Sequence, residues 1–477
     1  MKASNFNLKS IKIWKVGSES GEPVYIYKSG TSQGGVVLAF QYFEDLIDVG
    51  YKATLTINDT GFNLISTLPV QGFEKVTIEV TDYLGKAHEY AFRLWKVGNR
   101  IEADRRRIYT LGLVSEAFIL NEGSIVNKVL EGTPTKIVEK LLKEYLSVPG
   151  SKIKTQPSLN VMKMIPANKK PFGIIRDLQA KAVSESSVEP KVKTAKPSSA
   201  TAATTSQRSD APTAASVKSG SAGYFFYETR DGFVFRSIDS VVSPDPKKFS
   251  GSEPVAEYVY KPAKIDKTEA EDDRKIKNIV FQSEIDIMKK MRAGAYSSLI
   301  CFFNINTGKY EEYTYKLSDV WDKMAHLGTQ TVLPSGQKSL SQYPTRILST
   351  VVNHENWYNG TGVANPEEGS DNTNAVSDSQ KQYLAQSIAR GGILSNYQLS
   401  IEVTGNLDLR VGEKIIVKMP NQVPNQSKGE LGSFDPEHSG VYLIKSINHQ
   451  FTMQNLECLT VLQLIRDSLG YKESNVS

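Results

Sequence analysis

The histidines of this chain, residues often used for metal binding and proton transfer, are few and scattered. A zinc hydrolase helix carries two histidines one turn apart, with a glutamate between them. His354 is followed by Glu355 but by no second histidine one turn later, and no other His-x-x-x-His or Glu-x-x-His spacing occurs. The sequence therefore predicts no metal site. The histidines are His88, His326, His354, His438 and His449.

Other catalytic and ligand-binding motifs are missing or stand in the wrong context. Residues 30–34 match Gly-x-Ser-x-Gly, but they join two short expected strands, whereas a nucleophile elbow joins a strand to a helix. The chain has no Gly-x-x-x-x-Gly-Lys-Ser/Thr, no Gly-x-Gly-x-x-Gly after a strand and no Cys-x-x-Cys. Acidic pairs such as Glu44-Asp45 and Glu311-Glu312 are more typical of solvated faces than of glycosidase carboxylates. We therefore expect no enzyme, no catalytic residue and no cofactor.

Length and charge indicate a protein of several domains without a strongly charged partner. The chain has 477 residues, with 57 basic and 52 acidic side chains and a net charge of +5. This balance gives no electrostatic reason to expect stable binding to nucleic acid or to an anionic membrane. The N-terminus lacks the apolar core of a signal peptide, and no apolar run could span a bilayer, so we expect cytoplasmic synthesis and no stable membrane association. Cys301 and Cys458 lie in apolar runs and are predicted to be buried and reduced.

The elements that would position any site are mainly short strands, beginning with a β domain at residues 1–112. At residues 53–57 (ATLTI) and 76–80 (VTIEV) apolar and polar residues alternate, which places one face of each strand on a core and the other in water. Gly, Asn and Asp turns separate these strands from their neighbours. The pattern predicts an antiparallel sandwich or barrel.

Residues 113–270 are predicted to form an α+β middle domain. Thr133 is a suitable N-cap before Pro134, and a second helix is expected from Pro171. Residues 184–223 contain no aromatic side chain and are rich in Ser, Thr, Ala and Pro, which indicates a flexible linker. After it, two aromatic strands meet at Asp231-Gly232, a hairpin signal, so the linker interrupts the domain.

A second β domain is predicted at residues 271–326 and 395–468. Its expected strands include residues 296–305 and 310–317, and later residues 399–404, 415–419, 441–447 and 456–465. Residues 327–394 read as an insertion: a polar segment at 327–377 precedes a helix near residues 379–389 that Asp378 could cap. Residues 469–477 form a C-terminal tail.

Two distant stretches of the chain read alike. Residues 72–80 are GFEKVTIEV and residues 411–419 are VGEKIIVKM, each a turn followed by a strand. Each lies within a series of short strands, so the sequence predicts one β unit used twice. The fold class we expect is α+β, mainly β, with two β-barrels and an α+β domain between them.

Several motifs run in order through most of the chain: residues 108–115, the helix after Thr133, NKKPF at 168–172, YETRDGF at 227–233, RAGAY at 292–296, residues 405–412, GVYLI at 440–444 and LIRDS at 464–468. In this order and spacing they resemble the central baseplate hub protein of contractile-tailed, T-even-like bacteriophages. The resemblance is more distant to hub and spike-base proteins of other contractile tails and of type VI secretion. Residues 184–223 and 327–377 depart from the family pattern as insertions.

The resemblance implies a structural virion protein with two tube-protein-like barrels. A homotrimer of such chains would present six similar units, and could seat a threefold spike on one side and a sixfold ring on the other. The implied partners are a tail-tube or tube-initiator ring and the central spike protein. Genome DNA would pass through without specific binding, and the protein would reside in the tail baseplate after assembly in the host cytoplasm.

Two sets of site residues are expected if the resemblance holds. Subunits would pair through the edges of strands at residues 90–97 and 310–317, because an uncovered strand edge pairs promiscuously. A neutral or acidic bore would let DNA pass. The expected interface residues are Tyr90, Phe92, Leu94, Tyr313 and Tyr315. The expected channel-lining residues are Glu44, Asp45, Asp48, Glu284 and Asp286.

Two alternatives remain open from the sequence. One is a hub with a cell-wall hydrolase in residues 327–377, which contain His354, Glu355 and Asp371 but little apolar material to build a pocket. The other is a monomeric carbohydrate-binding β-sandwich.

Overall fold

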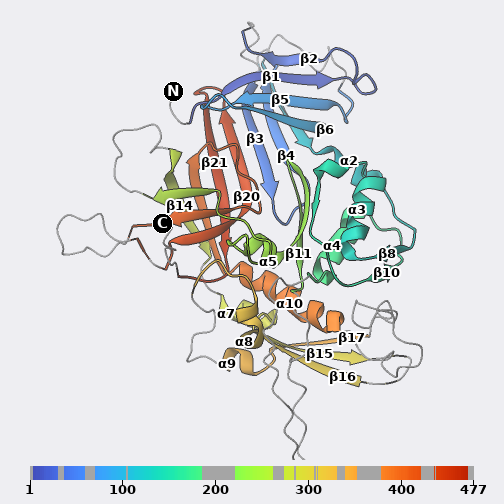
Figure 1. Cartoon of the computed structure of the whole chain (residues 1–477). Helices are drawn as coiled ribbons and strands as arrows, with labels where there is room; N and C mark the ends of the chain where they lie inside the picture. The colour runs from blue at the N-terminus through green and yellow to red at the C-terminus, as the bar shows by residue number, and fades with distance from the viewer. Residues whose placement is uncertain are drawn as a thin grey trace, which may run out of the picture.

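The computed structural model describes most of the chain, and thirteen of its strands form one continuous sheet. Strands from the two ends of the chain, such as β3 and β20, lie side by side at the centre of the molecule (Figure 1). The described residues are 4–30, 37–59, 70–103, 106–184, 221–260, 273–283, 286–303, 305, 308, 310–329, 339–351, 378–420, 434–435 and 437–470.

The first β unit occupies one half of this sheet, in the order β3-β4-β7-β6-β5-β1-β2. All of its pairings are antiparallel, and the inward residues of each strand form one apolar core that includes Phe40, Leu55 and Leu111. The predicted alternation is confirmed in β4, where Ala53, Leu55 and Ile57 are buried. The strands are β1 (Asn7–Trp14), β2 (Val24–Lys28), β3 (Val37–Asp45), β4 (Lys52–Asn58), β5 (Lys75–Thr81), β6 (Ala87–Ala103) and β7 (Arg106–Val114).

The second unit closes on itself as a six-stranded barrel in the order β19-β13-β14-β18-β21-β20, with β20 pairing back to β19. Its core includes Ile401, Val417 and Leu462. The prediction of a mainly β protein with an α+β domain is confirmed. The strands are β13 (Ala256–Tyr260), β14 (Lys275–Ser283), β18 (Tyr397–Thr404), β19 (Lys414–Lys418), β20 (Gly440–Thr452) and β21 (Glu457–Arg466).

The two units share their strand order over five strands. In the first unit β3, β4, β7, β6 and β5 are consecutive neighbours; in the second, β14, β18, β21, β20 and β19 are. The chain visits both sets in the same sequence, and every one of these pairings is antiparallel. The predicted duplication is therefore present in the topology.

The correspondence extends to individual residues. The pairing of β6 with β7 shifts between Leu94 and Lys96, and the pairing of β20 with β21 shifts between Ile444 and Ser446. Pairing shifts also occur at the same place in β3 and β14. Bulges re-aim the side chains that follow, so these two shared shifts align the units. β6 shifts again between Gly98 and Ile101, and β14 between Phe281 and Ser283, where β20 and β3 do not.

The repeated sequence lies at equivalent places in the two units. Residues 72–80 lead into β5, and residues 411–419 lead into β19. Phe73 and Gly412, which align, both have a positive φ, of 76° and 80°. In both turns a glutamate carboxylate accepts a backbone N–H three residues earlier, Glu74 from Gln71 and Glu413 from Arg410.

The sixth strands differ in direction. β1 pairs antiparallel with β5, whereas β13 pairs parallel with both β19 and β14. The prediction of a purely antiparallel second barrel is therefore wrong, because β13 enters the barrel directly from the middle domain and runs in the opposite direction to its counterpart in the first unit.

The middle domain packs two helices on small sheets around Phe226, Phe235 and Leu178. The side-chain oxygen of Thr133 accepts the N–H of Lys136 and caps α3, as predicted. The predicted β11–β12 hairpin is present, but it turns at residues 230–231, one residue before the predicted Asp231-Gly232. The elements are α2 (Glu116–Gly123), β8 (Leu130–Gly132), α3 (Pro134–Glu144), η1 (Gly150–Lys152), β9 (Ile153–Thr155), β10 (Met162–Met164), α4 (Pro171–Lys181), β11 (Tyr224–Thr229), β12 (Gly232–Ser237) and α5 (Ile238–Val242).

The insertion into the second barrel is larger than predicted. β15 pairs with β16 on one side and with β17 on the other in a separate sheet, which packs on α10 through Ile300, Phe302 and Ala385. Their assignment to the second barrel was wrong, since local alternation does not specify which sheet a strand joins. Most of residues 327–377, the region of the possible hydrolase, lie outside the described residues. The elements are α7 (Ile287–Arg292), β15 (Ser297–Phe303), β16 (Tyr310–Lys316), α8 (Leu317–Val320), η2 (Trp321–Lys323), α9 (Ser339–Gln342), β17 (Arg346–Val351) and α10 (Asp378–Leu394).

Candidate functional site

The two units are joined edge to edge where β3 pairs antiparallel with β20. Tyr42 lies opposite His449 and Gln41 opposite Gln450 in this register. The outcome is an uninterrupted stretch of eight strands, β14-β18-β21-β20-β3-β4-β7-β6, half from each unit. These eight strands make up the joined sheet.

A buried carboxylate secures the junction. Glu44 accepts the Tyr42 hydroxyl at 2.7 Å and the backbone N–H groups of Arg230 and Val411 at 3.0 and 3.2 Å. Burial raises the pKa of Glu44, and the nearby Arg410 charge opposes that rise. Glu44 therefore ties the first unit to the second unit and to the middle-domain hairpin.

Of the predicted channel-lining residues that the structure describes, Glu44, Asp45 and Asp48 lie together at the end of β3, and Asp286 lies apart from them at α7. Glu44 is buried, so its assignment to a bore was wrong; the sequence could not show that three donors would enclose it. Asp45 accepts the N–H groups of Ile47 and Asp48. Asp48 is exposed beside Lys52, and Asp286 caps α7. Glu284 lies outside the described residues.

The predicted interface residues mostly face cores. Tyr90, Phe92 and Leu94 are buried within the first unit, and Tyr315 is buried in the small core against α10; Tyr313 packs beside that core and is partly buried. The assignment of the buried four was wrong. In β6 the cause is that the strand has one core face, and these alternate residues point to it. The exposed part of β6 begins at Trp95.

One face of the joined sheet carries mainly amide and hydroxyl side chains, with Glu402, Lys52 and Asp45 as charged groups. The other face carries the apolar residues of the two cores, such as Leu55 and Leu462. Between the polar side chains lie Phe43, Leu459 and Val461, and Lys52 and Asp45 are near one end. The half-buried polar residues of this face are Gln41, Thr54, Thr56, Thr110, Ser400, Glu402, Ser446, Asn448, Gln450 and Gln463.

The joined sheet ends in two strand edges that no described strand covers. β6 pairs with β5 through residues 87–93, and beyond residue 95 only β7 pairs with it. On the edge of β14 that faces away from β18, β13 pairs only with Lys275 and Ile276. Uncovered edges with exposed apolar side chains mark sites of strand pairing.

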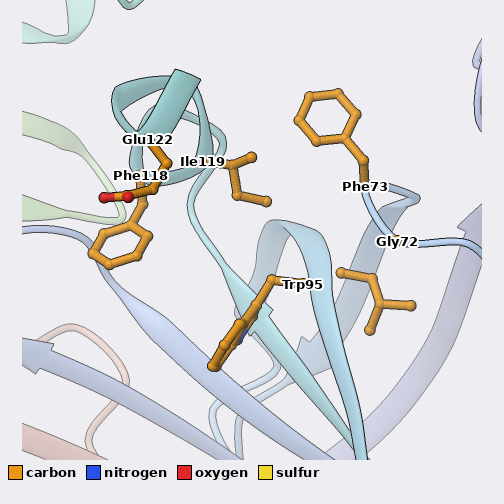
Figure 2. A pocket seen from close by; sticks show the side chains of 7 residues that line it. Gly72, Phe73, Trp95, Phe118, Ile119 and Glu122 are labelled. Atoms are coloured by element: carbon orange, nitrogen blue, oxygen red, sulfur yellow. The ribbon is translucent and has the colours of Figure 1, made fainter. Parts of the chain in front are cut away.

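A hollow of about 290 Å³ adjoins the free part of β6. Figure 2 shows Trp95 at its floor, Phe118 and Ile119 from α2 on one side, and Phe73 on the other. Among the described residues that line it, Glu122 is the one ionisable side chain, and no nucleophile meets a base. Its lining is suited to apolar contact.

Among the described residues no cluster of histidine, cysteine or acidic side chains is arranged to hold a metal ion. Within the same part of the chain, no helix is both long and apolar enough to cross a membrane.

The most perturbed carboxyl group in the middle domain is a packing residue. Glu228 is buried and accepts the Ser115 hydroxyl at 2.5 Å, and burial raises its pKa to about 8. Between pH 4.5 and 8 the folded protein keeps this proton while the unfolded chain has lost it. The stability contribution is therefore present at low pH and is lost as pH rises through this window.

Replacing Glu228 with glutamine should remove this pH dependence. The free energy of unfolding of the variant, relative to the wild type, should rise by about 1.4 kcal/mol for each pH unit within the window. Urea denaturation of both proteins at pH 5, 6.5 and 8 measures the difference. A difference that stays constant with pH would contradict the assigned protonation.

Comparison with known proteins identifies the fold. No protein-family model matches the chain. No curated protein matches it by sequence. A tail protein from Neisseria meningitidis aligns over 97% of both chains at 12% identity, with a TM-score of 0.50. The 43 kDa tail protein of prophage MuSo2 from Shewanella oneidensis aligns over 96% of this chain and 99% of its own, at 8% identity and a TM-score of 0.50. The chain therefore has the fold of these two tail proteins, as its resemblance to baseplate hubs implies.

Proposed function

We propose that the protein is the homotrimeric hub of a phage-type tail baseplate, joining a sixfold tail-tube ring to a threefold central spike. The observation that carries the proposal is the duplicated unit, whose two copies share strand order over five strands and a pairing shift at two equivalent places. Three chains arranged around a threefold axis would present six equivalent units. Such a ring fits a sixfold partner on one side while keeping threefold symmetry for the other.

The fold supports a structural role in a tail. Both tail proteins cited above align over nearly their whole length, so the likeness includes the middle domain and the insertion and not only one barrel. In the proposed function the protein is part of the virion baseplate, which is assembled in the host cytoplasm. It acts by positioning other proteins and has no enzymatic step.

Native mass spectrometry tests the trimer directly. The purified chain of 52.8 kDa should give a species of three times that mass at micromolar concentration. Adding the tube-initiator and spike proteins of the same tail should give one complex containing three hub chains. A lone chain at this concentration would favour the monomeric sandwich and contradict the proposal.

The polar face of the joined sheet is proposed to line the DNA channel. Gln41, Thr54 and Gln450 are neighbours across three strands on this face. Amide and hydroxyl groups offer no net charge to a polyanion, so DNA can pass without the counterion release that drives stable binding. This proposal keeps the prediction of a neutral bore but assigns different residues to its lining.

Changing Gln41, Thr54 and Gln450 together to lysine should create DNA binding where the wild type has none. Each lysine that reaches a phosphate releases counterions, so affinity should fall steeply as salt increases. Fluorescence anisotropy of a short labelled duplex at low and at physiological salt concentration measures this.

A matched variant controls for the added charge. Ser20, Ser151 and Ser318 are exposed on other parts of the surface, and their change to lysine adds the same charge. This variant should bind the duplex much more weakly. Equal binding by both variants would contradict the placement of the channel.

A further inference from the structure

We infer that neighbouring copies of this chain join through the free part of β6 in one copy and the free edge of β14 in the next, in the register of the internal β20–β3 junction. This inference rests on the proposed function, which supplies the ring, and names the surfaces that close it. The duplicated unit carries the inference, because β6 is the counterpart of β20, and β14 is the counterpart of β3.

β20 shows how one strand serves two partners along the same edge. Its residues Gly440–Leu443 pair with β19, and from Ser446 onward the same edge pairs with β3. β6 repeats the first half of this arrangement, because residues 87–93 pair with β5 as the counterpart of β19. The second half of the β6 edge has no partner among the described residues. The missing strand is a counterpart of β3.

Burial at equivalent positions shows what the missing strand would cover. Ile447 and Tyr42 are buried at the internal junction. The matched bulges place Val97 at the position of Ile447 and Phe281 at the position of Tyr42, and these side chains are 39% and 45% exposed. The same positions are therefore buried where the neighbouring strand is present and open where it is absent.

The register can be assigned to a residue pair. β6 carries one extra residue between Gly98 and Ile101 that β20 lacks. Beyond it, Ile101 pairs with Ile108 as Gln450 pairs with Leu459, and Val280 pairs with Ser400 as Gln41 pairs with Thr54. Since Gln41 lies opposite Gln450, Val280 of one copy should lie opposite Ile101 of the next. Two amides meet at the internal junction, whereas the side chains of Ile101 and Val280, 60% and 50% exposed, would meet between copies. Apolar side chains that lie opposite each other stabilise a strand pair.

In the same arrangement, a segment of the neighbouring copy would cover the hollow beside Trp95. At the internal junction, Leu46 follows β3, donates its N–H to the carbonyl of Lys445 and is fully buried. Trp95 is the counterpart of Lys445. After β14 the chain reaches α7, whose first residues, Ile287 and Met288, are exposed. The apolar start of α7 from the next copy would thus cover the hollow shown in Figure 2.

Disulfide cross-linking tests the register. A chain carrying Ile101→Cys and Val280→Cys should form covalent trimers on mild oxidation, because side chains opposite each other in a strand pair lie within disulfide range. Most of the protein should then migrate as a trimer on a non-reducing gel, and as a monomer after reduction. The native Cys301 and Cys458 are buried and should not react.

Matched controls come from the chain itself. Gln41→Cys with Gln450→Cys places the same pair at the internal junction, so oxidation should close a bond within one chain, with loss of free thiols but monomer mobility. Ile101→Cys with Lys277→Cys is out of register and should cross-link poorly. Urea denaturation of each reduced variant confirms that it is folded.

The outcomes separate the two proposals. In one outcome, light scattering shows a trimer and the internal control forms its disulfide, but the cysteines introduced at Ile101 and Val280 form none. That result would overturn the inferred junction and leave the hub intact. Equal cross-linking by the out-of-register pair would overturn the register. A monomer by light scattering would overturn the proposed function itself.

Discussion

Replacing Arg390 with alanine should destabilise the folded chain by about 3–5 kcal/mol, because it leaves two buried carboxylates without their cation. Arg390 is 2% exposed and lies in α10. Its Nη2 atom donates to Asp239 at 3.0 Å and its Nη1 atom to Asp467 at 3.3 Å. It also donates to the carbonyl of Ala325. One side chain thus connects the insertion, the middle domain and the end of the second barrel.

The remaining bonds of this network show that Asp467 is held as a charged group. Burial opposes its ionisation, but a hydrogen bond to His326 at 2.9 Å and the charge of Arg390 hold its pKa far below the ordinary value. Asp467 also accepts the N–H of Leu327 at 3.0 Å. Replacing Arg390 removes the cation but leaves the carboxylate charge of Asp467 buried. Breaking a buried ion pair in this way strongly destabilises the folded protein.

Chemical denaturation in urea measures the effect. Arg292→Ala is the matched control, since Arg292 is an exposed arginine of the same insertion and its loss should cost less than about 0.5 kcal/mol. If Arg390→Ala lowers the free energy of unfolding no more than Arg292→Ala does, the network contributes little to stability. We expect Arg390→Ala to lower the stability of the trimer only to the extent that it releases the insertion from the second barrel.

Local patterns in the sequence predicted individual elements well and their partners poorly. The capped helix at α3, the β11–β12 hairpin and the repeat at β5 and β19 depend on residues close together in the chain, and these predictions are confirmed. β15 and β16 alternate as barrel strands do, yet they join β17 and α10. Sheet membership depends on packing between distant segments, which alternation along one strand does not encode.

The candidate site shows the same limit at the scale of side chains. β6 is 17 residues long, and its first half serves a core while its second half is free. Tyr90, Phe92 and Leu94 carry the aromatic and apolar signal that suggested an interface, but they belong to the core half. The sequence signal that could have located the free half is the repeat itself: once β6 is aligned with β20, the residues after Trp95 correspond to those that pair with β3.

Replacing Gly412 with alanine should destabilise the protein by about 2–5 kcal/mol, combining the cost of a left-handed backbone with overpacking. Gly412 has a φ of 80°, and a Cβ atom there would lie 2.2 Å from the hydroxyl oxygen of Tyr227. Tyr227 is buried in the core of the second unit and cannot move freely. Its counterpart in the first unit, Phe73, has nearly the same φ, so the backbone alone does not require glycine at this position.

A double-mutant cycle with Tyr227→Leu separates the two causes. The shorter side chain removes the clash, so in that background Gly412→Ala should cost only the backbone contribution, about 1–2 kcal/mol. Urea denaturation of the wild type, both single variants and the double variant gives the coupling. If Gly412→Ala lowers the free energy of unfolding equally in the wild type and in the Tyr227→Leu background, a clash with the aromatic ring is not the reason for glycine at this position. Because the hairpin that carries Tyr227 also donates to Glu44 through Arg230, this contact helps hold the middle domain against the junction on which the ring depends.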